Sequence, residues 1–174
     1  METEMPLSRR ATLLGLAGLP MLALPRRASA AATVREITWE DLIPPGVPYS
    51  EIVGEGAYDE ANDTWLPVFD DNARAYNRAL DGVRVKLPGY VIPLEQSSAG
   101  IREFIYAPYA GACIHVPPPP PNQLVFVTSP DPWEDPDGFG AVWVTGVLRI
   151  AELDTNLARI GYEMTAETIE IYEF

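Results

Sequence analysis

The sequence predicts a mainly β fold, because an alternating pattern dominates its second half. From Val83 onward apolar residues alternate with polar ones, and the same alternation returns over residues 160–166. A period of two is typical of strands with one buried face. The segments between the strands are too short for crossover helices, so we expect the strands to be antiparallel.

Five or six short strands fit into about ninety residues of the second half of the chain. We expect them at residues 83–87, 90–94, 101–106, 124–128, 141–150 and 160–166, the last of which continues over residues 169–171 after a bend. Gly146, in the middle of a long strand, predicts a bulge or a sharp coil. A closed barrel would remove exposed sheet edges from strands of this kind. Residues 81–174 are therefore expected to form a small OB-like antiparallel barrel.

Residues 31–80 are expected to form an N-terminal arm followed by one α-helix. Asp70 can cap a helix over residues 72–80, and Gly82 is placed to end it. Residues 49–69 show little periodicity and are expected to be mainly loop. Three apolar residues are expected to anchor the arm on the barrel: Trp39, Leu42 and Ile43.

Residues 1–30 have the pattern of an export signal. An arginine pair, Arg9–Arg10, precedes an apolar run that is shorter than the roughly 20 residues needed to span a bilayer. Small residues up to Ala30 supply a cleavage site. The arginine pair indicates the twin-arginine route, with the general secretory route as the alternative. The sequence thus predicts a periplasmic protein, cleaved near Ala30, without a stable membrane anchor after cleavage.

The chain is strongly acidic. Its formal net charge is −13, and the loss of residues 1–30, which carry two acids and four arginines, brings it to −15. Such a surface repels phosphate backbones, so we expect no nucleic-acid binding. Metal cations or a basic partner would complement it. Solubility alone is the alternative reason for the charge.

Cys113 and His115 are the only cysteine and the only histidine, and they lie two residues apart. In an extended chain this spacing places both side chains on one face, about 6.5–7 Å apart at Cα. A thiolate and an imidazole suit zinc or copper, and Glu95 or Glu103 could complete the site. The alternative is that Cys113 is a buried small residue and His115 a hydrogen-bonded loop residue.

No catalytic residues are expected. A nucleophilic cysteine needs a histidine that approaches from elsewhere in the fold, and the only histidine of this chain is a near neighbour of Cys113.

Five consecutive prolines, Pro117, Pro118, Pro119, Pro120 and Pro121, predict a rigid polyproline II segment. This segment could dock in the aromatic groove of a partner and display Asn122 and Gln123 in fixed directions. It could instead be a structural strap across one end of the barrel.

Two motifs resemble those of a known family. The first, G-Y-x-x-P-L-E, runs from Gly89 to Glu95, and the second, C-I-H-V-P-P-P-P-P-N-Q, runs from Cys113 to Gln123. The chain resembles a bacterial exported family of unknown function that is often found as lipoproteins. The resemblance implies a gene neighbourhood with ABC-transporter components, some under zinc-responsive control. It implies no catalytic residues.

Two hypotheses follow. The first is a soluble periplasmic accessory protein of metal handling or of an envelope ABC transporter, which binds zinc or copper through Cys113 and His115. The second is a non-enzymatic interaction module that uses the proline segment, with Cys113 and His115 structural. Since this chain has no lipobox cysteine, either role at a transporter would require protein contacts.

Overall fold

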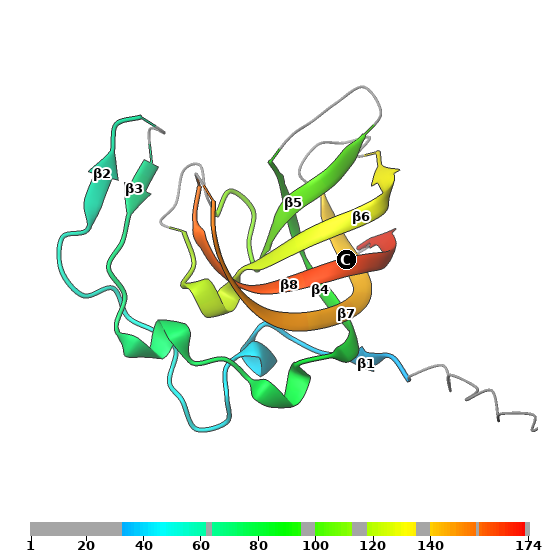
Figure 1. Ribbon diagram of the computed structural model, residues 1–174, viewed down its shortest axis with the longest axis horizontal. Helices are drawn as coiled ribbons and strands as arrows, with labels where there is room; N and C mark the ends of the chain where they lie inside the picture. The colour runs from blue at the N-terminus through cyan, green and yellow to red at the C-terminus, as the bar shows by residue number, and fades with distance from the viewer. Residues whose placement is uncertain are drawn as a thin grey trace, which may run out of the picture. The chain divides into compact units, whose positions relative to one another are not determined.

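Five long strands close into a ring (Figure 1). The structure is a computed structural model that describes residues 33–61, 64–94, 100–112, 118–134, 140–155 and 157–172. The predicted export signal lies outside this range. The strands are β4 (Val83–Pro93), β5 (Ile101–Ala107), β6 (Val125–Trp133), β7 (Ala141–Asp154) and β8 (Arg159–Ile171).

Hydrogen bonds join the ring in the order β4, β5, β6, β8, β7 and back to β4. Every neighbouring pair is antiparallel except β6 and β8, which are parallel. A five-stranded closed ring with this crossover is the plan of an OB-like barrel. The predicted fold class, mainly β and OB-like, is therefore confirmed, whereas the expectation that all strands are antiparallel fails at β6 and β8.

Strand β4 is one continuous strand, although two separate strands were expected at residues 83–87 and 90–94. Its first part pairs with β7 and its last part with β5, while β1 (Arg35–Glu36) adds a short parallel pairing. The indole of Trp39 stabilises the middle of the strand, since its Nε1 donates a hydrogen bond of 2.6 Å to Pro88 O. A Cβ on Gly89 would lie 2.7 Å from the same ring, so glycine admits the indole there.

The barrel core consists of side chains from alternate strand positions. On β5, for example, Phe104 and Tyr106 are fully buried in the main cluster, whereas Ile105 belongs to a second, smaller cluster on the opposite face. The smaller cluster contains Ile92, Ile105, Ala107, Ala112, Leu124, Ala158 and Ile160. Segments on both sides of the proline run thus pack against the outside of the sheet.

The bulge predicted at Gly146 is present. The register between β7 and β8 shifts between Thr145 and Gly146. The absence of a side chain at Gly146 lets the backbone of β8 approach closely, because a Cβ there would lie 2.2 Å from Thr165 O.

The N-terminal arm is anchored on the barrel largely as predicted. Trp39 packs on Tyr106 with 5.4 Å between ring centroids, and Leu42, which ends the 3-10 helix η1 (Glu40–Leu42), is fully buried. Ile43 is only partly buried. The carbonyl of Leu42 accepts a 2.6 Å hydrogen bond from Tyr162 Oη of β8.

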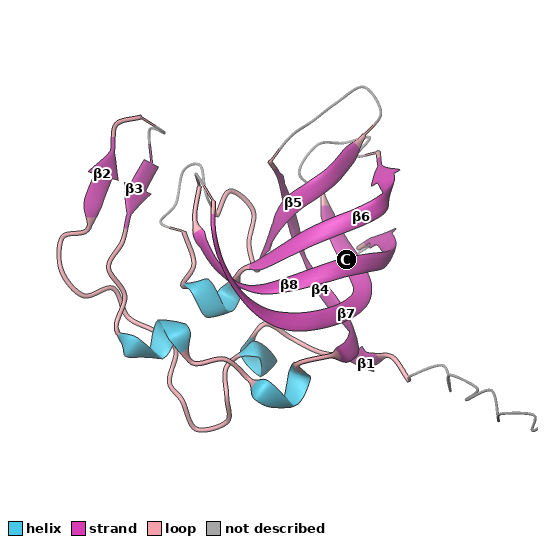
Figure 2. Ribbon diagram, viewed as in Figure 1, coloured by secondary structure: helices cyan, strands magenta, loops and turns pink. Residues whose placement is uncertain are grey.

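The α-helix predicted over residues 72–80 is wrong. Two separate 3-10 turns stand there, η2 (Asp71–Arg74) and η3 (Arg78–Leu80), and Figure 2 shows them as distinct short helices. An α-helix would need the carbonyls of Asn72 and Ala75 as acceptors for its own amides. Here the side-chain amide of Asn122 donates to both carbonyls, at 2.9 and 3.1 Å, so a tertiary contact replaces helical hydrogen bonds.

Residues 49–70 form a two-stranded hairpin instead of the expected loop. The strands β2 (Ala57–Asp59) and β3 (Thr64–Leu66) pair at its tip, and a bridge between Ile52 and Phe69 joins its base. We call residues 49–70 the hairpin arm. The sequence did not predict the pairing of β2 with β3, because glycines and acidic residues interrupt the alternation of apolar residues.

The buried hydroxyl of Tyr162 predicts a loss of stability at alkaline pH. It donates to Leu42 O and accepts from Asn77 N at 2.7 Å, and burial raises the pKa of Tyr162 to about 12. The folded state therefore holds a proton that the unfolded state releases near pH 10. The contribution of Tyr162 to the free energy of unfolding is expected to be level below about pH 10 and to fall as pH rises toward about 12.

Urea unfolding at several pH values measures this effect. Tyr162→Phe should lower stability by roughly 1–2 kcal/mol at neutral pH, because Leu42 O loses one of its two donors and Asn77 N loses an acceptor. It should also reduce the alkaline slope, to which Tyr76 and Tyr106 contribute as well. Tyr58→Phe, on the exposed hairpin arm, is the matched control. An unchanged slope in Tyr162→Phe would show that this hydroxyl does not cause the alkaline loss.

Candidate functional site

In the five-proline run, the four prolines that the structure describes, Pro118 to Pro121, are all buried. Pro120 has polyproline II angles, with φ −62° and ψ 155°, whereas Pro121 already begins the 3-10 helix η4 (Pro121–Gln123). The extended proline segment therefore ends one residue earlier than predicted. Pro117 lies outside the described residues. Burial of these rings favours the structural strap over prolines displayed freely to a partner.

Asn122 and Gln123 do not occupy the exposed positions that direct partner binding would require. They are 0% and 2% exposed. The amide of Asn122 binds the η2 turn, and Gln123 Nε2 donates to Trp39 O at 2.9 Å. These hydrogen bonds hold the N-terminal arm to the barrel, so burial favours a structural role for both side chains over the predicted contact with a partner.

The predicted metal ligands are only partly described. Glu103 lies on β5 with an exposed side chain, whereas Cys113, His115 and Glu95 lie outside the described residues. Within the described ranges, no group of three or more His, Cys, Asp or Glu side chains is placed to hold a metal ion.

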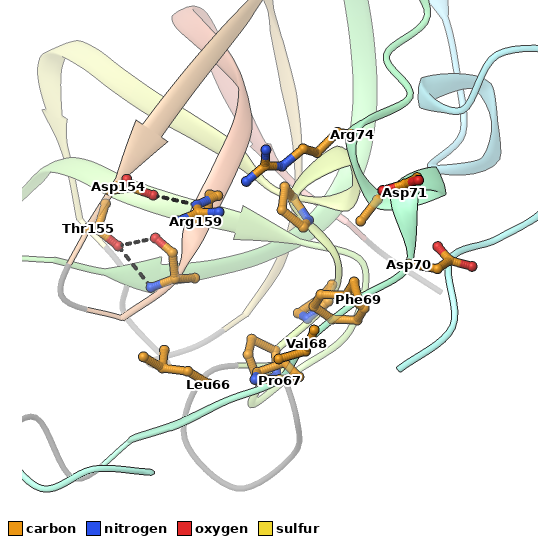
Figure 3. Close-up of a pocket in the computed structure, with 15 residues that line it drawn as sticks. Leu66, Pro67, Val68, Phe69, Asp70, Asp71, Arg74, Asp154, Thr155 and Arg159 are labelled. Atoms are coloured by element: carbon orange, nitrogen blue, oxygen red, sulfur yellow. Dashed lines mark hydrogen bonds and ion pairs between the residues drawn. The ribbon is translucent and has the colours of Figure 1, made fainter. Parts of the chain in front are cut away.

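A pocket of about 510 Å³ lies where three distant segments meet (Figure 3). The hairpin arm and the η2 turn supply residues 66–74 apart from Asn72, the proline segment supplies Pro118, Pro119 and Pro121, and the turn between β7 and β8 supplies the remainder. Its apolar lining consists of Leu66, Pro67, Val68, Phe69, Ala73, Ala158 and the three prolines. The pocket is thus a mostly apolar recess with a rigid proline wall.

The turn between β7 and β8 is held firmly. Thr155 Oγ1 donates to Ala158 O at 2.8 Å and accepts from Ala158 N at 3.0 Å, as the dashed lines in Figure 3 show. Arg159 Nε binds Asp154 Oδ1 at 2.8 Å, and this hydrogen bond, with the charge of Asp154, raises the pKa of Arg159. The guanidinium at this side of the pocket is therefore already neutralised.

Asp70 fixes the base of the hairpin arm beside the pocket. Its carboxylate accepts hydrogen bonds from Ser50 Oγ at 2.8 Å and from Asn72 N and Nδ2 at 3.0 and 3.1 Å. The hydrogen bond from Ser50 is the main cause that lowers the pKa of Asp70. A lowered pKa in the folded state means that this contribution to stability is present at neutral pH and is lost as pH falls.

Ser50→Ala is expected to raise the pKa of Asp70 toward its ordinary value. The carboxyl ¹³C chemical shift of Asp70, followed by NMR between about pH 2 and pH 6, measures this change. Ser129→Ala, a serine on β6, is the matched control and should leave the titration of Asp70 unchanged. An identical titration in both variants would mean that Ser50 does not hold this carboxylate.

The sequence analysis missed the exposed apolar surface of the hairpin arm. Eight large apolar side chains are exposed among the described residues, and six of them lie on this arm, so exposure is concentrated there. They are Tyr49, Ile52, Val53, Tyr58, Leu66 and Val68. Leu66 and Val68 also line the pocket, so part of the exposed apolar surface borders the pocket.

The fold and the pocket define a class of protein: a small OB-like barrel with an N-terminal hairpin arm and a proline-walled apolar pocket. In the part of the chain that is described, no helix has the length and apolar character needed to cross a membrane.

The chain belongs to the DUF3299 family, described as a protein of unknown function, whose pattern it matches over residues 39–171. It is similar to the crystal structure of a DUF3299 family protein from Pseudomonas aeruginosa PAO1, with 36% sequence identity and a TM-score of 0.65. The similarity covers 82% of this chain and 98% of that protein. No curated protein matches the chain.

Proposed function

We propose that this protein is a non-enzymatic interaction module that binds an extended polypeptide segment along the hairpin arm and in the adjoining pocket. The observation that carries the proposal is the concentration of exposed apolar side chains on residues 49–68, two of which line the pocket. A concentration of exposed apolar side chains beside a recess marks a binding site more often than scattered apolar residues do.

The surroundings of the pocket suit binding without rearrangement. Buried prolines form one wall of the pocket, and the turn between β7 and β8, held by Thr155, forms another, so little chain entropy would be lost when a ligand binds.

The partner would be a component of an envelope ABC transporter, and the protein would act in the periplasm after cleavage near Ala30. Both assignments rest on the family resemblance and on the export signal in the sequence.

Selection of peptides from a random display library tests the binding function. Peptides recovered with the wild-type chain should bind at least about tenfold more weakly to a Leu66→Ser/Val68→Ser variant, because that variant loses apolar contacts without gaining charge. Ile171→Ser, which removes an exposed apolar side chain from β8, is the matched control and should bind normally. Recovery of no peptides, or equal binding by all three proteins, would contradict the proposal.

Binding of zinc or copper is a second candidate function. It is favoured by the position of Glu103, which lies two residues before Ile105 and therefore on the same face of β5. Ile105 belongs to the same smaller cluster, on the outside of the sheet, as Ala112, the residue that precedes Cys113 in the sequence. The proposed ligands are Cys113 and His115 with Glu103 or Glu95.

Metal titration decides this second candidate. Calorimetry with zinc should show binding of one ion by the wild-type chain and its loss in a C113A/H115A variant, with a weaker site in Glu103→Gln. Glu167→Gln, on β8, is the matched control. If the wild-type chain and the C113A/H115A variant behave alike, the metal site does not exist.

A further inference from the structure

We infer that the partner segment is basic: an extended stretch of another protein in which lysine or arginine residues flank apolar side chains. This inference rests on the proposed function, because it specifies what would bind to the hairpin arm and the pocket.

The charge of the hairpin arm is entirely of one sign. No lysine, arginine or histidine occurs between Arg35 and Arg74, whereas ten acidic residues lie between them. Seven of these acids lie within residues 49–71. A one-sided charge of this density attracts a basic segment and repels an acidic one.

Three exposed glutamates of the hairpin arm form no ion pair among the described residues. Glu51, Glu55 and Glu60 are exposed, and within the described part of the chain no ion pair joins them to a basic residue. On the barrel, by contrast, Arg84 and Lys86 neutralise acids of β8, at 2.6 Å from Glu167 and 2.9 Å from Glu170. The unneutralised charge is thus concentrated next to the exposed apolar side chains.

An extended conformation of the partner follows from the sheet itself. The strands β2 and β3 form a two-stranded sheet, and no third strand pairs with either of them among the described residues. An open strand edge can accept the backbone of an added strand, whose alternate side chains would then meet the apolar surface of the arm.

Two other classes of ligand fit this surface poorly. Nucleic acids and anionic lipid surfaces carry phosphates, which the acidic arm repels. An uncharged apolar peptide would gain the apolar contacts but would forgo the electrostatic attraction. Charge complementarity therefore selects a basic segment of a protein.

Three synthetic peptides test the inference on the full chain. They share one apolar centre of alternating valine and phenylalanine, and lysine, glutamine or glutamate flanks it. Calorimetric titration at about 0.02 M and about 0.3 M salt should show the lysine peptide binding about tenfold more tightly than the glutamine peptide at low salt, and about threefold more tightly at high salt. The glutamate peptide should bind most weakly.

Charge variants of the arm localise the effect. Glu55→Gln/Glu60→Gln should reduce the affinity for the lysine peptide toward that for the glutamine peptide. Glu167→Gln/Glu170→Gln, which removes two acids from the barrel, is the matched control and should keep the preference.

Each contrary result has a distinct meaning. Equal binding of the lysine and glutamine peptides, stronger binding of the glutamate peptide, or an unaltered preference in the arm variant would overturn the inference. In these cases loss of glutamine-peptide binding in Leu66→Ser/Val68→Ser would still support the proposed function. If none of the three peptides binds, the inference is overturned, and the library selection decides whether the proposed function is lost with it.

Discussion

Replacing Gly146 with valine is expected to prevent the barrel from folding, and replacing it with alanine is expected to lower the free energy of unfolding by about 3 kcal/mol. A Cβ at this position would lie 2.2 Å from Thr165 O and 2.9 Å from Met164 Cγ. The first of these atoms belongs to the backbone of β8, so no side-chain rotation relieves the contact. The longest strand pairing of the barrel, between β7 and β8, would have to open.

Urea unfolding followed by circular dichroism measures the effect of Gly146→Ala. Gly111→Asn is a suitable control, because a Cβ at Gly111 meets nothing within 4 Å and its φ of 73° lies close to the left-handed region that asparagine visits. The control should lose less than about 1 kcal/mol. A Gly146→Ala protein as stable as the wild type would contradict the close approach of β7 and β8.

Asn122→Asp is expected to cost about 3 kcal/mol or more, and Asn122→Ala about 2 kcal/mol. The wild-type amide donates to Asn72 O and Ala75 O from a fully buried position. An aspartate would replace this donor with a buried negative charge facing two carbonyl oxygens. Alanine would only remove the two hydrogen bonds.

The pH dependence of the Asn122 variants separates these causes. As pH falls toward about 4, the introduced carboxyl should bind a proton and regain one donor, so the deficit of Asn122→Asp should shrink while that of Asn122→Ala stays level. Urea unfolding at several pH values measures both. Equal stability of Asn122→Asp and the wild type at neutral pH would mean that this amide does not hold the η2 turn.

The barrel was predictable because its signals are local. Residues such as Tyr162 and Met164 alternate with polar neighbours along a single strand, and Gly146 marks its own bulge. The anchoring role of Trp39 was also accessible, since a large aromatic residue in a polar arm needs a surface to cover it. These features depend on a few neighbouring residues, and a sequence displays them directly.

The η2 turn, the hairpin arm and the pocket were not predictable in the same way. The α-helix predicted from Asp70 onward fails because Asn122, some fifty residues later, takes the carbonyls that a helix would use. The pocket is formed by the hairpin arm, the proline segment and the turn between β7 and β8. These segments are far apart in the sequence, so no local sequence pattern predicts that they are in contact. The proline run indicated rigidity, but its burial depends on what packs around it.

The central claim, that the hairpin arm and the pocket bind an extended segment, is tested most directly by NMR. A ¹⁵N-labelled chain would be titrated with a peptide recovered by library selection, and the backbone amide shifts would be followed. The largest changes are expected over residues 64–74 and 155–159, on the two sides of the pocket. Changes confined to the barrel strands away from the pocket, for example around Glu103 of β5, would contradict the claim.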